Sequence, residues 1–246
     1  MRQLSHRKAH PRLPPDLPMN SMRRLLELER ETELNFVTHA AANEANPKGW
    51  PASLLMFHLA QWRGRMRQAL DDVRVGRPQT LPPENTDEFN DAELPDGAGI
   101  SLEDAAARSE IALAAIIDLY DAVGERPFAW RISRRTTEAV IRNSYIHPRQ
   151  HMYEYLVENG DSWNAHRLAE EGVNEMRQVG APPTTLGTVI YNLACVRVAQ
   201  GRTDEALPLL EEALDMSPDL RDLLAGDEDL EPLKNDVRFR ALVAGT

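Results

Sequence analysis

The segment GWPASLLMFHLAQWRGRMRQALDDVR, residues 49–74, decides the fold of this chain. Pro51 suits the first turn of a helix, and Gly76 lies just beyond its predicted end near Arg74. Between them, apolar side chains recur every three or four positions, as they do on one face of an α-helix: Leu54, Leu55, Leu59, Trp62, Met66 and Leu70. We therefore predict a long amphipathic helix with one face in a protein core.

Similar signals on either side of this segment predict three further long helices. Ser21 caps the first, over residues 22–42; the third runs from Ser101 to Gly124; the fourth runs from Thr136 to Glu158. Residues 77–100 contain four prolines and two glycines, and we predict a long ordered or semi-ordered loop there, of a length that is often functional. The only short extended piece predicted is Phe128–Ser133. The pattern is typical of an all-α protein, with an up-down four-helix bundle over residues 20–160.

Composition and charge restrict the classes of function. The 246 residues carry a net charge of −11, and the segment from Gly160 onward contributes −8 of it, with 16 acidic and 8 basic residues. This charge argues against a nucleic-acid partner, because phosphate binding needs clustered Lys and Arg. No stretch approaches the roughly 18 apolar residues of a membrane span, so we expect no membrane partner.

Cysteine usage and the N-terminus predict a cytoplasmic protein. Cys195 is the single cysteine, which excludes an intramolecular disulfide, and we interpret it as a small apolar packing residue. Residues 1–19 are basic and proline-rich without an apolar signal core, so we predict a flexible tail.

The C-terminal segment, residues 161–246, has shorter predicted helices separated by Gly and Pro turns. Residues 188–218, TVIYNLACVRVAQGRTDEALPLLEEALDMSP, resemble a tetratricopeptide repeat, with small or apolar residues at the helix-crossing positions and a proline at the end: Leu193, Ala194, Gly201, Ala206, Leu210, Ala213 and Pro218. Ile190 and Arg197 depart from the pattern, which has aromatic residues there. The array is about one and a half repeats, so we expect it to pack against the bundle. It is either a cap, a self-association contact or a docking groove for a protein partner.

Three of the seven histidines fall on core-facing stripes. His58 lies on the apolar face of the 49–74 helix, and a buried imidazole there needs a partner. His147 and His151 are four residues apart, so they share one face of the fourth helix. Two imidazoles at this spacing can chelate one metal ion, and a third from a facing helix completes a set with open positions. The alternative is a metal-free cluster of histidines bonded to each other, to water or to a tyrosine.

Three stretches carry a family resemblance. GWPASLLMFHLAQWRGRM, residues 49–66, resembles the second helix of the DinB-like four-helix bundles. IHPRQHMYEYLVENGD, residues 146–161, resembles their last helix, and NTDEFND, residues 85–91, resembles a loop of the ClbS/DfsB-like branch. The likeness covers about residues 20–160. Pro148 departs from it, because a proline inside the fourth helix forces either a kink or a restart with His147 as the cap.

The resemblance implies a divalent metal ion, commonly zinc, nickel or iron, bound by His58, His147 and His151. It also implies a class that contains thiol transferases, a thiol-dependent isomerase and hydrolases of reactive small molecules, some of them using a low-molecular-weight thiol. As further pocket-lining residues we predict Trp62, Asp87, Asn90 and Tyr155. Glu154 is either a partner or base beside His151 or a plain surface acid.

We therefore expect a metal-dependent enzyme that acts on a small molecule by thiol transfer or hydrolysis, with a role in detoxification or resistance as one form of it. The alternative is a non-enzymatic scaffold protein that docks partners through residues 161–246. No Ser-His-Asp or Cys-His arrangement and no Gly-rich phosphate loop competes with the histidines.

Overall fold

The computed structural model describes residues 19–43 and 47–245, and it confirms the all-α class. The predicted tail over residues 1–19 lies, apart from Met19, outside the described residues. The elements come in this order, η marking short non-α helices: α1 (Met19–Asn43), α2 (Ala52–Arg74), α3 (Thr86–Glu93), η1 (Leu94–Gly97), α4 (Leu102–Val123), β1 (Pro127–Trp130), β2 (Ser133–Arg135), α5 (Thr136–Ile141), η2 (Arg142–Ile146), α6 (His147–Glu158), α7 (Ser162–Val179), α8 (Pro183–Ala199), α9 (Thr203–Met216), η3 (Pro218–Leu220), α10 (Arg221–Leu224), η4 (Glu228–Leu233) and α11 (Val237–Ala244).

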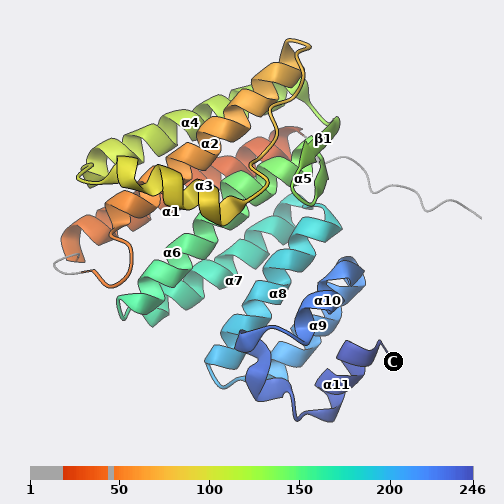
Figure 1. Cartoon of the computed structure of the whole chain (residues 1–246). Coiled ribbons are helices and arrows are strands. Elements are labelled where there is room, and N and C mark those ends of the chain that lie inside the picture. Colours follow the sequence, from red (N-terminus) through yellow and green to blue (C-terminus); the bar gives the residue numbers. More distant parts are fainter. Residues whose placement is uncertain (1–18, 44–46, 246) are drawn as a thin grey trace, which may run out of the picture.

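The long helices pack side by side from one end of the molecule to the other (Figure 1). α2 lies along α4, and α1 packs on α4 and on α7. α7 also contacts α6 and α8, and α8 packs along α9, so α7 is shared between the predicted bundle and the C-terminal segment. One hydrophobic cluster runs from Met22 in α1 to Phe239 in α11. The C-terminal helices therefore pack against the N-terminal ones, as expected of so short an array.

The sequence signals place most helix ends correctly. Ser101 is the N-cap of α4, where its side chain accepts a hydrogen bond from the backbone N–H of Asp104, and Gly124 ends that helix at a φ of 65°. The predicted cap at Ser21 is wrong, because α1 begins two residues earlier, at Met19. A hydroxyl in the first turn fits inside a helix, and Met22, Leu25 and Leu26 bury the helix face there.

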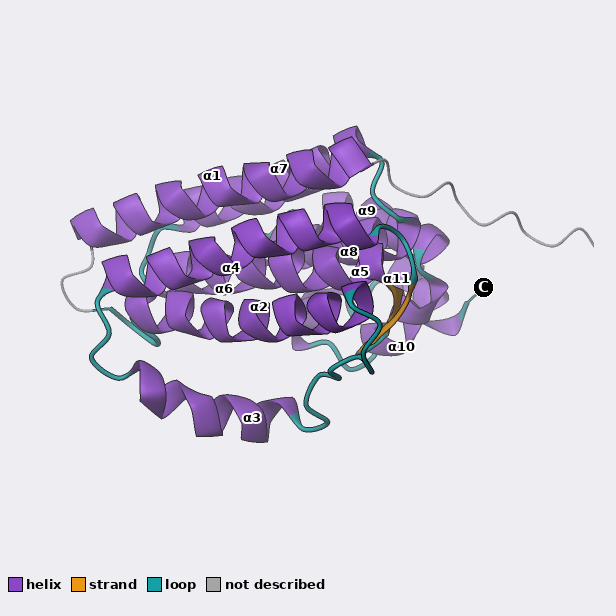
Figure 2. Cartoon of the chain, turned by 90° about the horizontal axis from the view of Figure 1, so that it is seen from above, coloured by secondary structure: helices purple, strands orange, loops and turns teal. Residues whose placement is uncertain are grey.

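The predicted loop over residues 77–100 is in part wrong, because it contains α3 and η1. Asn85 caps α3 by accepting hydrogen bonds from the backbone N–H groups of Asp87 and Glu88. α3 has no buried residue and forms a separate layer outside α2, as Figure 2 shows. Prolines and acidic residues dominate this stretch and predict a loop, while only one cap residue and a short helical pattern mark the helix.

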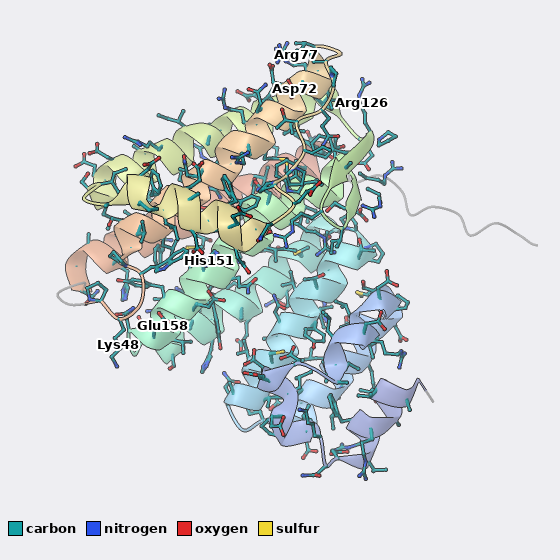
Figure 3. The ribbon with its side chains drawn as sticks, viewed as in Figure 1. Lys48, Asp72, Arg77, Arg126, His151 and Glu158 are labelled. Carbon is teal, nitrogen blue, oxygen red and sulfur yellow. The ribbon has the colours of Figure 1, made fainter. Side chains whose placement is uncertain are left out.

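The start of this connection is tied to the C-terminal end of α2 by Asp72 (Figure 3). Its carboxylate accepts hydrogen bonds from Thr80, from the guanidinium of Arg77 and from Gln68. These bonds, with those from Thr80 foremost, outweigh desolvation and lower the pKa of Asp72 to about 2. The side-chain amide of Gln79 donates to the carbonyl of Ala129 in β1, which joins the same segment to the hairpin.

The β-hairpin is larger than predicted. The expected extended piece Phe128–Ser133 overlaps β1, which pairs antiparallel with a second short strand, β2, that the sequence analysis missed. Arg131 in its turn has a φ of 52°, the left-handed conformation that non-glycine residues seldom adopt.

The fourth predicted helix runs over the expected residues, but it contains a π-helical turn, η2, directly before His147. The backbone N–H of His147 donates to the carbonyl of Arg142, five residues back. Pro148 lies in the first turn of α6, and His147 is the first residue of that helix rather than its cap. The predicted position of Pro148 in a first helical turn is thus confirmed, but His147 is not a cap, and a π turn joins α5 to α6 without a gap. No helix in the described part of the chain is both long enough and apolar enough to cross a membrane.

Candidate metal centre

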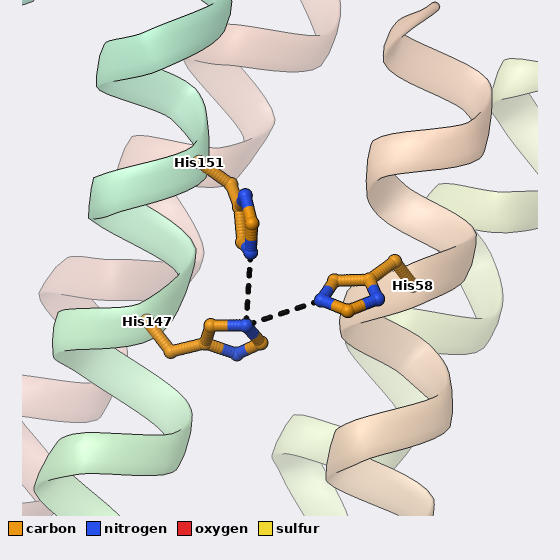
Figure 4. Close-up of side chains that lie close together, drawn as sticks. All are labelled: His58, His147 and His151. Atoms are coloured by element: carbon orange, nitrogen blue, oxygen red, sulfur yellow. Dashed lines mark hydrogen bonds between the residues drawn. The ribbon is translucent and has the colours of Figure 1, made fainter. Parts of the chain in front are cut away.

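The structure brings His58, His147 and His151 together between α2 and α6 (Figure 4). The Nε2 atom of His147 lies 3.1 Å from Nε2 of His58 and 3.0 Å from Nε2 of His151. The three rings stand at steep angles to one another, with interplanar angles of 66° to 83°. Three nitrogen atoms from three rings therefore converge on one small space.

Hydrogen bonds alone satisfy this arrangement poorly. A neutral imidazole has one N–H donor and one acceptor nitrogen, so Nε2 of His147 cannot both donate to one neighbour and accept from the other. A metal ion solves this conflict, because it accepts a lone pair from all three nitrogens. Ligands about 2.0–2.1 Å from a metal lie about 2.8–3.4 Å apart for octahedral to tetrahedral angles. The two Nε2 separations from His147 fall in this range, so the group could hold a metal ion.

The surroundings keep two of these rings neutral, the form that binds metals. Burial, followed by the charge of His151, lowers the pKa of His58 to about 3. Burial also lowers the pKa of His147 well below its ordinary value, and the nearby charges of His151, His58, Arg63 and Arg131 add to this effect. His58 and His147 are therefore in the form that binds a cation at neutral pH.

Glu154 is a carboxylate partner of the third ring. Its Oε2 lies 3.3 Å from Nδ1 of His151. An Nδ1–H bonded to a carboxylate leaves the Nε2 lone pair free to face the other two histidines, as in many metal sites. Burial raises the pKa of Glu154, but its bonds with His151 and Gln150 and the His151 charge outweigh this and lower it overall.

Aromatic side chains wall the cluster. Trp50 stacks against His151, with ring centroids 5.9 Å apart, and meets His58 edge-on at 5.3 Å. Trp62 lies edge-on to both His58 and His147, at 6.4 and 6.1 Å. Gly49 makes the placement of Trp50 achievable, because its φ is 66° and a Cβ there would overlap the carboxylate of Glu158. His151 is partly accessible, with 24% of its side chain exposed.

The four predicted pocket residues have different positions. Trp62 contacts the histidines directly, and its indole N–H donates to Oδ1 of Asn90, 3.1 Å away on α3. Asn90 is therefore linked to the histidines through Trp62. Asp87 is exposed on the first turn of α3. Tyr155 is buried, and its ring packs edge-on at 5.1 Å against Phe36 of α1.

Sequence reasoning missed three residues near the cluster. Trp50 was visible as the GWP triplet before α2 but carried no predicted role. Arg63 carried no predicted role, because an arginine in a long helix is usually exposed; in the structure its side chain is buried, with 1% exposed. Phe89 packs edge-on against Trp62 at 5.3 Å and under the guanidinium of Arg65, and nothing in the sequence marks it beyond an aromatic residue in a polar loop.

A second group of ligand-type atoms lies in the C-terminal segment, where Cys195, Asp227 and Asp229 approach one another. Burial, followed by the two aspartate charges, raises the pKa of the Cys195 thiol above its ordinary value. The hydroxyl of Tyr191 donates to Oδ2 of Asp227, 2.7 Å away. A protonated thiol and an engaged carboxylate are poor metal ligands, so the interpretation of Cys195 as a packing residue is retained.

Comparison with known proteins adds no relative: no protein-family model, no curated protein and no solved structure matches this chain.

Proposed function

We propose that His58, His147 and His151 bind a divalent metal ion and that this protein is a DinB-like, metal-dependent enzyme acting on a small molecule. The observation that carries the proposal is the convergence of three Nε2 atoms that hydrogen bonds alone satisfy poorly. The sequence resemblance over residues 20–160 supports it, because the same three positions are the ligands in that class. Zinc, nickel and iron are the candidate ions, since imidazole suits all three.

The residues around the ligands have distinct roles in this proposal. A bound metal ion would act as a Lewis acid and lower the pKa of a bound water or thiol. Glu154 orients His151 through Nδ1 and keeps its Nε2 directed at the centre. Trp50 and Trp62 cover the rings of the ligands and exclude water from two sides. The partly exposed His151 marks the side from which a substrate reaches the site.

The proposed reaction class is thiol transfer or hydrolysis of a reactive small molecule, with a low-molecular-weight thiol as a second substrate in the first case. The site favours neither reaction by itself, because the described residues beside the histidines are mainly aromatic and Glu154 is the one carboxylate that contacts a ligand. Detoxification of an electrophile is one form of this activity.

Metal analysis tests the proposal. Protein purified without added metal is compared with His58→Ala, His151→Ala and a control, His166→Ala, which removes a histidine of α7 outside the cluster. We expect about one metal ion per chain in the wild type and the control, and more than about 100-fold weaker binding in the two ligand variants, beyond the 10–100-fold loss seen for outer-shell partners. Equal metal content in all four proteins would reject the metal site and the enzymatic function with it.

The alternative of a docking function for residues 161–246 stays a prediction. Within that segment Ala194, Ala206 and Ala213 are fully buried, so the small residues of the repeat pattern serve helix packing. Arg197 is also largely buried and pairs with Glu170 and Glu205, and so does not offer a free cation to a partner.

A further inference from the structure

Pro148 removes a backbone hydrogen-bond donor at the centre of the candidate site. In an uninterrupted α-helix the N–H of residue 148 would donate to the carbonyl of Ser144, but proline has no N–H. Ser144 is fully buried, so water does not replace the missing donor easily. The guanidinium of Arg63 does so instead: its Nη2 donates to the carbonyl oxygen of Ser144, 3.2 Å away. A side chain of α2 thus completes the backbone of the fourth helix.

Three further hydrogen bonds, to two residues, hold Arg63 for this contact. Both carboxylate oxygens of Glu33 in α1 accept from it, one at 2.8 Å from Nη1, and the hydroxyl of Ser109 in α4 accepts from Nη1 at 2.7 Å. Arg63 and Glu33 are only 1% and 5% exposed. A buried charge is tolerated only when it is paired and hydrogen-bonded, so this arginine is fixed in one position.

The contact lies where the helix changes its register. The bond from the N–H of His147 to the carbonyl of Arg142 spans five residues, one more than in an α-helix. One extra residue rotates the later part of the helix by about 100° relative to the earlier part. α5 can therefore bury Val140 and Ile141 while α6 turns His147 and His151 toward His58. The side-chain amide of Asn143 donates to the carbonyl of Trp62 at 3.3 Å, a second bond between this turn and α2.

We propose that Arg63 is a positioning residue for the metal site: by replacing the donor that Pro148 removes, it fixes the π turn that aims His147 at His58. This inference rests on the proposed metal site. Arg63 follows His58 by five residues on α2, so one helix carries both a ligand and the group that positions the ligand opposite it.

A second buried arginine provides a matched control. Arg149 is 7% exposed, and its Nε donates to Oε2 of Glu29, 2.6 Å away. It therefore forms a buried pair with a glutamate of α1, as Arg63 does, but its hydrogen bonds go to Glu29, Thr32 and Glu175 and not to Ser144. Removing either pair takes away a buried ion pair, whereas removing the Arg63 pair also takes away the bond to Ser144.

The experiment removes both charges of a pair at once, because a lone buried carboxylate could unfold the protein. The variants are Arg63→Met with Glu33→Gln, the control Arg149→Met with Glu29→Gln, and each pair combined with Pro148→Ala. Alanine restores an N–H that can donate to Ser144. For each folded variant, Co²⁺ affinity is measured by competition with a chelator, together with the visible spectrum of bound Co²⁺.

We expect the Arg63 pair variant to bind Co²⁺ about 10–100-fold more weakly and with an altered spectrum, as for other groups that orient a metal ligand. In the Pro148→Ala background the same change should cost less than about threefold, while the Arg149 pair should have the same small effect in both backgrounds. An Arg63 effect that is equal with proline and with alanine would overturn the inference, since it would then reflect the ion pair alone.

A second readout separates this inference from the proposed function. If the wild-type chain takes up no Co²⁺, the proposed metal site fails. In that case the ¹⁵N chemical shifts of His147 in metal-free protein test whether Arg63 positions the His147 ring. We expect them to move in the Arg63 pair variant and to return toward wild type when Pro148→Ala is added. Unchanged shifts in the Arg63 pair variant would reject Arg63 as a positioning residue.

Discussion

The two groups of ligand-type side chains in this chain look alike by distance and differ in chemistry. In both, the potential ligand atoms lie within 4.8 Å of one another. The histidine group joins α2 to α6, and burial keeps His58 and His147 unprotonated. The group of Cys195, Asp227 and Asp229 joins α8 to η4, and burial there keeps the thiol protonated.

The difference teaches that one physical effect has opposite consequences for the two groups. Burial disfavours the charged form of any side chain. For imidazole the uncharged form is the metal ligand, whereas for a thiol the charged thiolate is. Without a metal, the buried rings of His58 and His147 are therefore already in the ligand form, while the buried thiol of Cys195 would have to lose a proton to bind a cation.

The largest expected effect concerns acid stability and tests whether the histidines are buried in their neutral form. The pKa of His58 is near 6.5 in the unfolded chain and about 3 in the folded one. As the pH falls below 6.5 the unfolded chain takes up a proton that the folded chain does not, so the free energy of unfolding decreases toward pH 3. For His58 alone, the limit is about 4–5 kcal/mol.

Urea unfolding of chelator-treated protein between pH 7.5 and 4 measures this loss. In His58→Gln, which cannot titrate there, the decrease should be smaller than in the wild type by a few kcal/mol, of the order given by the pKa difference. His166→Gln is the matched control and should follow the wild type. Parallel curves for all three proteins would show that His58 is not held neutral by burial.

A smaller effect is expected where α3 contacts Trp62 beside the histidine group. Asn90→Ala removes the acceptor of the Trp62 indole N–H, a bond worth about 1 kcal/mol. Amide hydrogen exchange in α3 should then be about fivefold to tenfold faster, because local opening becomes easier by that amount. Asp87→Ala, which changes an exposed side chain of the same helix, is the control. If both variants exchange alike, the bond does not hold α3 on α2.

The smallest effect is expected in the second group. Cys195→Ala and Asp227→Asn should leave the metal content of the protein unchanged. Asp227→Asn weakens the bond from Tyr191 and should lower the free energy of unfolding by about 1 kcal/mol or less. Loss of bound metal in either variant, measured beside His58→Ala, would reverse the ranking of the two groups.

Much of the architecture follows from local sequence signals. The apolar spacing of residues 49–74 gives α2, and Ser101 and Gly124 mark the two ends of α4. The second strand of the hairpin and α3 were missed, because both are too short for periodicity to separate them from a loop. Ser21 was a false cap, since a favourable residue type is no guarantee that the helix starts there.

The sequence by itself determined that the protein is helical and that three histidines lie on core-facing stripes, because the spacing of apolar side chains fixes helix faces. It also determined that Pro148 removes a hydrogen bond from the fourth helix. Tertiary structure decided how that loss is met: a π turn and Arg63 of a different helix complete the backbone. It also decided that Trp50 walls the cluster and that Asp87 is exposed on α3. These outcomes depend on contacts between distant segments, which no local pattern encodes.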